Sequence, residues 1–457
     1  MKIAVLIGLL MLVVVVWLTS AEYSDALHVL RSRFLGQVLT WVACAMLLAN
    51  LLALIWRVVL VFRYNPAAPC SNRELPVCTV VVPAYNEGEQ VLKTLRSIAV
   101  SDYPKGKLRV IVVNDGSTDD TWQWIRCAVD EFPHVIFALN QTMNCGKRRA
   151  LYAGFLHAVG EILVTIDSDS QVEPHTIRNL VSPLVRDRKV GAVAGNIRIL
   201  NRADGPIPRM LYYAFAYSFE FIRASQSEVN TVMCTPGALS AYRRNLVTEV
   251  LPRWLNQRFC GQIANIGEDR AMTNLILCEG YHVHFQRNAV AYTKVPSRYR
   301  DLCKMFLRWS RSNIRETLVM TGFAFRKFRV SSSLGTRLNL ILHWMSLTLG
   351  QVMKLVVLGY LLWKPEVFVP RAMFGAAITA SIPAVFCAIR YRSSKVLWMY
   401  VYGFFWLVGL LWIGLYAWVT PHRTGWLTRG SDSTKPTGAP ELNVATPKVH
   451  CPGYISE

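Results

Sequence analysis

Ile162-Leu-Val-Thr-Ile-Asp-Ser-Asp-Ser170 joins an apolar run to two acidic residues near the middle of the chain. Its apolar, β-favouring residues predict a buried strand, and the run ends abruptly in Asp167 and Asp169. If the backbone stays extended, both carboxylates lie on the same side of the strand. Two acids at the end of a strand suit a hard divalent cation that carries phosphates. Because Asp-x-Asp also occurs in ordinary turns, the neighbouring sequence must decide between a metal site and a turn.

The sequence around this stretch alternates between apolar runs and helical patterns. We expect strands over residues 78–83, 108–114 and 134–138 and a fourth strand into Asp167, with helices over residues 88–100, 119–131 and 147–158. This β-α-β-α alternation predicts an α/β domain with a mainly parallel sheet and helices on both faces. Ligands of such sheets bind beyond the carboxyl ends of the strands.

Polar residues follow three of the predicted strands, and we expect them to meet at one edge of the sheet. They lie in Pro83-Ala-Tyr-Asn-Glu87, Asn114-Asp-Gly116 and Asp167-Ser-Asp169. Asp115 is either a nucleotide-binding carboxylate or an Asx turn that caps the next helix. Tyr85 either packs in the domain or stacks on a base. A dinucleotide-binding site is excluded because no Gly-x-Gly-x-x-Gly follows the first strand.

Three further motifs each have a functional and a structural interpretation. Gly146-Lys147 begins a predicted helix, a position suited to phosphate, although a basic helix start is the alternative. Gly267-Glu-Asp-Arg270 holds either a general base or an N-terminal helix cap. Arg308-Trp309 offers a guanidinium for diphosphate and a flat ring for a sugar, or else an anchor at the membrane surface.

The composition indicates a membrane protein with a globular middle. The chain has 457 residues, is 53% hydrophobic and carries a net charge of +21. Nucleic-acid binding ranks low, because neither zinc-finger spacing nor an RNA-binding signature is present. The positive charge instead fits the positive-inside bias and attraction to anionic lipid. The 11 cysteines contain no Cys-x-x-Cys pair, which favours reduced cysteines and a cytosolic globular domain.

Hydropathy divides the chain into five regions. We expect two N-terminal transmembrane helices in residues 1–63 (the first run also resembles a signal peptide), a cytosolic catalytic domain in 64–300, amphipathic interfacial helices in 301–337, a C-terminal transmembrane region in 338–420 and a polar tail in 421–457. The basic stretch 287–329 is interleaved with aromatic residues, which predicts amphipathic helices at the inner membrane surface. Residues 22–36 would form an external loop.

The order of these motifs resembles the processive membrane glycosyltransferases of family 2, which include hyaluronan, nodulation chitooligosaccharide, chitin and cellulose synthases. The resemblance runs from about residue 78 to 316 and extends to Cys234-Thr-Pro-Gly237 and Gly425-Trp-Leu-Thr-Arg429. It implies a glycosyltransferase-A-like domain inserted between transmembrane helices of a bacterial inner or plasma membrane. The partners would be a UDP-sugar donor, a growing polysaccharide and membrane lipid, with no nucleic acid.

The resemblance also assigns roles to residues. Asp269 would be the catalytic base, and Asp169 would bind Mg or Mn. The donor nucleotide and diphosphate would contact Tyr85, Glu87, Asp115, Lys147, Asp167 and Arg308; the acceptor would contact Glu268, Trp309 and Cys234; the tail residues Trp426 and Arg429 would return to the site. The implied reaction inverts a UDP-sugar, N-acetylglucosamine foremost, into a β-linked polymer that is extruded across the membrane.

Rival interpretations are another polysaccharide synthase, such as a cellulose-type enzyme, a non-processive lipid-linked glycosyltransferase, and a non-catalytic membrane channel or anchor that binds nucleotide. Two departures from the family pattern concern the acceptor side. Met305 stands where the family has Gln, and Pro236-Gly237 reverses the usual Gly-Pro order. Met cannot make the hydrogen bonds of an amide. From the sequence, restoring Gln at position 305 is predicted to keep or raise product length.

Overall fold

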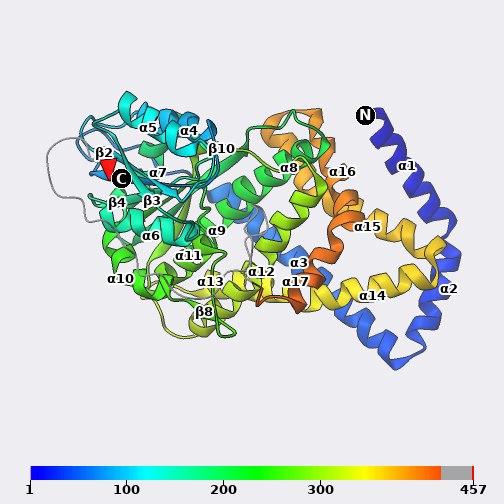
Figure 1. Cartoon of the computed structure of the whole chain (residues 1–457). Helices are drawn as coiled ribbons and strands as arrows, with labels where there is room; N and C mark the ends of the chain where they lie inside the picture. Colours follow the sequence, from blue (N-terminus) through cyan, green and yellow to red (C-terminus); the bar gives the residue numbers. More distant parts are fainter. Residues whose placement is uncertain (1, 424–454, 457) are drawn as a thin grey trace.

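The computed structural model describes residues 2–423 and 455–456. An α/β domain occupies one side of the molecule, and the long apolar helices extend from its other side (Figure 1). Helices α1 (Lys2–Leu18) and α2 (Ser20–Arg31) lie farthest from the sheet, as Figure 1 shows. The predicted tail contacts Trp426 and Arg429 fall outside the described residues.

A nine-stranded sheet forms the centre of the α/β domain, in the order β11-β3-β2-β1-β4-β7-β6-β10-β5. The strands are β1 (Cys78–Ala84), β2 (Leu108–Asp115), β3 (Ile136–Gln141), β4 (Ile162–Thr165), β5 (Gln171–Val172), β6 (Val190–Ile199), β7 (Ser240–Arg243), β10 (His282–Thr293) and β11 (Ile455–Ser456). Strand β1 is parallel to β2 and β4, β2 is parallel to β3, and β6 is parallel to β10. Strand β7 lies antiparallel between β4 and β6. The predicted mainly parallel sheet is confirmed.

The helices of this domain cover both faces of the sheet. They are α4 (Gln90–Ala99), α5 (Thr121–Glu131), α6 (Lys147–His157), α7 (Thr176–Arg186), α8 (Pro206–Tyr217), the π-helical η1 (Ser218–Arg223), α9 (Ala224–Glu228), α10 (Arg244–Leu255), α11 (Glu268–Cys278) and α12 (Tyr299–Ala324). A two-stranded hairpin, β8 (Arg258–Phe259) and β9 (Gln262–Ile263), precedes α11.

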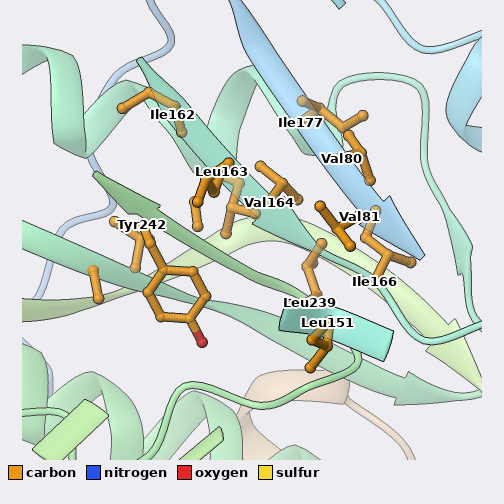
Figure 2. Close-up of a cluster of buried hydrophobic side chains, with 14 of the residues drawn as sticks. Val80, Val81, Leu151, Ile162, Leu163, Val164, Ile166, Ile177, Leu239 and Tyr242 are labelled. Carbon is orange, nitrogen blue, oxygen red and sulfur yellow. The ribbon is translucent and has the colours of Figure 1, made fainter. Parts of the chain in front are cut away.

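Burial on both faces explains why β1 and β4 consist of nearly continuous apolar residues. All seven residues of β1 and all four of β4 are buried. Helix α6 packs closely on β1, because a Cβ on Gly154 would lie 2.3 Å from Cγ1 of Val81. Figure 2 shows Val81 and Leu163 in this core together with Leu151 of α6 and Ile177 of α7.

Two local predictions were wrong. Strand β4 ends at Thr165, and the backbone N–H of Ser170 donates to the carbonyl of Asp167 (3.0 Å), so the two aspartates lie in a turn and not on an extended strand. The basic stretch was predicted to be helical from residue 287, but residues 282–293 form strand β10. Its apolar residues pair with β6, and this pairing outweighs the helical pattern of the charges.

The apolar helices outside the α/β domain are α1, α2, α3 (Phe34–Arg63), α13 (Leu334–Leu347), α14 (Leu349–Trp363), α15 (Pro365–Tyr391), η2 (Ser394–Leu397), α16 (Trp398–Phe405), the π-helical η3 (Trp406–Leu410) and α17 (Leu411–Val419). Four stretches of the described chain are long and apolar enough to cross a membrane, or five if α1 and α2, bent by 58°, form one span. Much of the loop predicted over 22–36 is therefore the helix α2.

Candidate active site

Lys147 is the residue on which three elements converge. It begins α6, and its Nζ lies 2.5 Å from Oδ1 of Asp167, in the turn after β4. The same Nζ lies 3.2 Å from Oε1 of Glu268, at the start of α11. Burial alone would lower the pKa of the Lys147 ammonium group. The charges of the two carboxylates outweigh this effect, so the pKa is raised. A lysine paired with two carboxylates therefore lies beyond the carboxyl ends of the parallel strands, where such sheets bind ligands.

Asp115 shapes the loop that precedes Lys147. Its Oδ1 accepts a hydrogen bond from the N–H of Cys145 (2.8 Å), and its Oδ2 accepts one from Gly146 (2.9 Å). Gly146 has φ of +90°, a conformation suited to glycine. Asp115 thus holds the start of α6 in place. It does not make the Asx turn that was the structural alternative at this position; Asp119 makes that turn at the start of α5, where it accepts a hydrogen bond from the N–H of Thr121 (3.0 Å). Burial raises the pKa of Asp115 to about 6, although its two hydrogen bonds oppose the rise.

The loop after β1 is tied to the same turn. Oε1 of Glu87 accepts a hydrogen bond from the hydroxyl of Ser168 (2.8 Å), between the two aspartates. The backbone N–H of Glu87 donates to Oγ1 of Thr121 (2.8 Å). Tyr85 is half-buried in this loop. The ends of β1, β2 and β4 therefore meet, as the sequence predicts.

Asp169 lies on the side of the turn that faces β10. Its Oδ1 accepts hydrogen bonds from the hydroxyls of Ser170 and Thr293, both at 3.3 Å. Within the described residues, no three His, Cys, Asp or Glu side chains form a group that could hold a metal ion. A hard cation at a nucleotide site needs only one or two carboxylates, because phosphates and water complete its shell. The two carboxylates of this turn fit a cation of that kind.

The adjacent acids at the start of α11 have different environments. Glu268 is buried, and burial alone would raise its pKa. The charges of Lys147 and Arg308 outweigh this effect and lower the pKa of Glu268. Asp269 is half-buried. Burial and the charge of Glu268 raise the pKa of Asp269, and its Oδ2 accepts a hydrogen bond from Sγ of Cys234 (3.6 Å). One acid is therefore held ionised, while the other is a stronger base that is still accessible.

Helix α12 carries Arg308 and Trp309. Arg308 is near enough to Glu268 to lower its pKa. The Trp309 ring is 38% exposed, and its centroid lies 6.1 Å from that of Phe215 and 5.6 Å from that of Phe306. The aromatic contacts fix the ring and leave a flat surface open.

Met305, one turn before Trp309, is only 7% exposed. It belongs to an apolar cluster that includes Leu302 of α12 and Leu410 and Ile413 from the C-terminal helices. Met is the residue type that these surroundings favour, because a buried amide without a partner is destabilising.

Gly237 is a site residue that, in the sequence, stands out only as a departure from the family pattern. A Cβ at this position would lie 2.7 Å from Nζ of Lys147 and 3.5 Å from Oδ1 of Asp167. No larger residue fits without displacing the ion pair. The Pro-Gly dipeptide was the available signal, but the sequence alone does not show what the glycine approaches.

Comparison with known proteins gives the family of this chain. Residues 76–312 match the family described as "Glycosyltransferase like family 2". The chain belongs to this family. The predicted family, the class of enzyme and the fold class are thereby confirmed.

The similarity of this glycosyltransferase to its relatives extends beyond the catalytic domain. The chain is 34% identical to an N-acetylglucosaminyltransferase of Rhizobium meliloti (strain 1021), over 55% of this chain and 59% of that enzyme's length. It is 30% identical to an N-acetylglucosaminyltransferase of Rhizobium sp. (strain N33), over 81% of each chain, and 26% identical to hyaluronan synthase 1 of Xenopus laevis, over 90% of this chain and 77% of the other.

Among solved structures, a mannosyltransferase of Pyrobaculum calidifontis in complex with GDP-Man and Mn2+ shares the fold. The TM-score is 0.54 at 23% sequence identity, and the match covers 80% of this chain and 96% of that one. The likeness concerns the fold alone.

Proposed function

We propose that this glycosyltransferase is an inverting, processive enzyme that builds a β-linked polymer containing N-acetylglucosamine from UDP-sugars. The observation that carries the proposal is the junction of Lys147 with Asp167 on one side and Glu268 on the other, directly beside Asp269. It joins a cation suited to diphosphate with an accessible base. The relatives named N-acetylglucosaminyltransferase and hyaluronan synthase support the choice of sugar.

The donor would lie over the strand ends. Tyr85, Glu87 and Asp115 would hold the nucleotide, and Asp167, Lys147 and Arg308 would surround the diphosphate. Asp169 would hold Mg or Mn, and a bound ion would neutralise charge that grows on the leaving UDP. The cationic side chains of Lys147 and Arg308 act on the same charge.

The acceptor would enter from the side of Trp309, Cys234 and Glu268. Asp269 would remove the proton of the acceptor hydroxyl as its oxygen forms a bond with the anomeric carbon. The bond from that carbon to the diphosphate oxygen breaks, and UDP leaves with the electron pair. Attack from the face opposite UDP converts an α-linked donor into a β-glycoside.

The chain is a membrane protein by the length and composition of its apolar helices. We place it in a bacterial inner or plasma membrane with the catalytic domain in the cytosol, where nucleotide sugars are made, and with extrusion of the polymer through the membrane part. Membrane lipid would surround the apolar helices.

The direct test supplies membranes that contain the full chain with single and paired labelled UDP-sugars. Products are sized on a gel and digested with linkage-specific hydrolases. Long β-linked chains containing N-acetylglucosamine are expected, and EDTA should stop their synthesis until Mg or Mn is added. A single transferred sugar would favour a lipid-linked, non-processive enzyme, and nucleotide binding without any transfer would favour a channel or anchor.

A further inference from the structure

A buried polar cluster lies beneath the proposed site, and the reaction as described makes no use of it. We call Gln257, Asn274, Arg315 and Glu316 the α11–α12 cluster. Glu316 is 0% exposed, and Arg315 and Asn274 are each 1% exposed. Removing charged groups from water so completely is unfavourable unless each finds good partners.

Glu316 is the centre of this cluster. Its Oε1 accepts hydrogen bonds from Nε2 of Gln257 (2.9 Å) and Nε of Arg315 (3.0 Å). Its Oε2 accepts one from Nδ2 of Asn274 (3.0 Å), which also donates to the Glu316 carbonyl (2.8 Å). Two of these partners lie 59 and 42 residues away in sequence. Charge-assisted bonds to separate segments fix α12 against α11 and the segment before it.

Gln257 extends the cluster to the helix that begins with Lys147. Its Oε1 accepts a hydrogen bond from Nη1 of Arg148 (3.2 Å), while its Nε2 donates one to Glu316. Arg148 also donates to the carbonyl of Trp254 (2.7 Å), whose indole N–H donates to the carbonyl of Glu268 (2.8 Å). One amide side chain therefore connects α6 with α12.

The cluster also holds the backbone that leads into α11. Arg315 donates from Nη2 to the carbonyl of Ile266, and a Cβ on Gly267 would lie 1.7 Å from the hydroxyl of Ser312. Gly267 has φ of +72°, so both its conformation and its space require glycine. Helix α12 thus touches the residue directly before Glu268 and Asp269.

We propose that Gln257 and Glu316 are positioning residues that keep Arg308 and Trp309 of α12 in register with Lys147 of α6 and with the acids of α11. The inference rests on the roles given above to these groups. Their alignment matters because a misplacement of about 1 Å at a catalytic group can lower the rate about 100-fold. Neither positioning residue needs to touch the substrates.

The test uses the full chain in membranes. Gln257→Leu removes both hydrogen bonds at nearly constant volume. At a temperature well below the unfolding midpoint we expect kcat to fall at least about 10-fold and KM for the UDP-sugar to rise, because Lys147 and Arg308 lose their alignment. The unfolding midpoint should fall, because Arg148 and Glu316 each lose a hydrogen-bond partner. Arg253→Gln is the matched control, because it removes the exposed ion pair with Glu279 that joins α10 to α11, and it should leave kcat unchanged.

A paired exchange separates positioning from simple stabilisation. Gln257→Glu alone places two carboxylates against each other and should lower kcat further. Combined with Glu316→Gln, it restores a donor–acceptor pair between the two positions and keeps an acceptor for Arg148. Nε of Arg315 loses the acceptor it shares with residue 257, so kcat should recover only in part. An unchanged kcat in Gln257→Leu, or a loss that follows the unfolding midpoint with no recovery in the double variant, would overturn the inference. If the wild type transfers no sugar, the proposed function fails first and the inference with it.

Discussion

Asp115 and Gly237 are the residues whose surroundings restrict the proposed donor site most. Both are defined by neighbours distant in sequence, the loop at 145–146 for Asp115 and Lys147 for Gly237. The sequence predicts Asp115 as a candidate because it ends a strand, but its partners come from a loop 30 residues later. The need for glycine at position 237 arises only once α6 and the β4 turn are brought together.

The pKa of Asp115 predicts a pH dependence of donor binding. Because this pKa is raised to about 6, Asp115 is ionised above about pH 6 and protonated below it. Protonation removes an acceptor from the loop before Lys147, so UDP should bind more weakly as the pH falls through 6. Calorimetric titration from pH 5 to 8 measures this, and Asp115→Asn should reduce the dependence to the part that comes from the terminal phosphate of UDP, which itself titrates near about pH 6. An equal dependence in both proteins would contradict the assignment.

Gly237→Ala should weaken donor binding. The added methyl group would lie 2.7 Å from Nζ of Lys147 and must displace it from Asp167. We expect KM for the UDP-sugar to rise about 10-fold, corresponding to about 1.4 kcal/mol. Gly322→Ala is the control, because its Cβ would meet no atom within 4 Å in helix α12. Steady-state kinetics with both variants decide whether space at position 237 matters.

Among the elements, the presence and type of β1, β2, β4 and α6 were predicted well from periodicity. These elements are buried on both faces or along one stripe, and such burial leaves a pattern of apolar residues in the local sequence. The turn after β4 was missed because acids at a strand end fit either conformation. Strand β10 was missed because its charges masked its pairing with β6. The contacts of α12 with α11 and with Gln257 join residues about 40 to 60 positions apart, which no local pattern contains.

Helix α12 gives a prediction that differs from the one drawn from sequence alone. Met305 packs in an apolar cluster, so Met305→Gln buries an amide among apolar side chains. We expect a loss of stability of about 1–3 kcal/mol and no gain in product length. Thermal unfolding and gel sizing of the product measure the two effects. Longer product at unchanged stability would support the original expectation that the amide assists the acceptor.

At the scale of the whole molecule, Glu220 connects the catalytic domain to the membrane part. It lies in the π-helical η1 and is fully buried. Its Oε2 accepts from Nε of Arg390 (2.8 Å) and its Oε1 from the hydroxyl of Tyr391 (2.8 Å), both at the end of α15. Arg198 of β6 lies 3.4 Å from the same carboxylate. The sequence predicts both parts of the molecule but gives no sign of this junction.

Replacing Glu220 should loosen that junction. Glu220→Gln removes the charge that Arg390 and Arg198 contact; because both arginines are partly exposed to solvent, we expect a loss of about 1–3 kcal/mol. Burial alone would raise the pKa of Glu220, but Arg390 and Tyr391 outweigh this effect and lower it. The stability that the ionised Glu220 contributes is therefore fully present above the pKa that Glu220 has in the unfolded chain. It is lost as the pH falls through the lower pKa of the folded protein. Thermal unfolding in detergent at pH 7 should show the loss, while Glu279→Gln at the surface should not.

The role of Asp269 as the base is tested by comparing Asp269→Asn with the wild type in two assays on the same membranes, polymer synthesis from UDP-N-acetylglucosamine and binding of UDP. Asp301→Asn, an exposed acid on α12, is the control for loss of a charge. We expect Asp269→Asn to abolish polymer synthesis and to leave UDP affinity within about twofold, because the base acts on the acceptor and not on the donor. Polymer synthesis at the wild-type rate in Asp269→Asn would contradict that role.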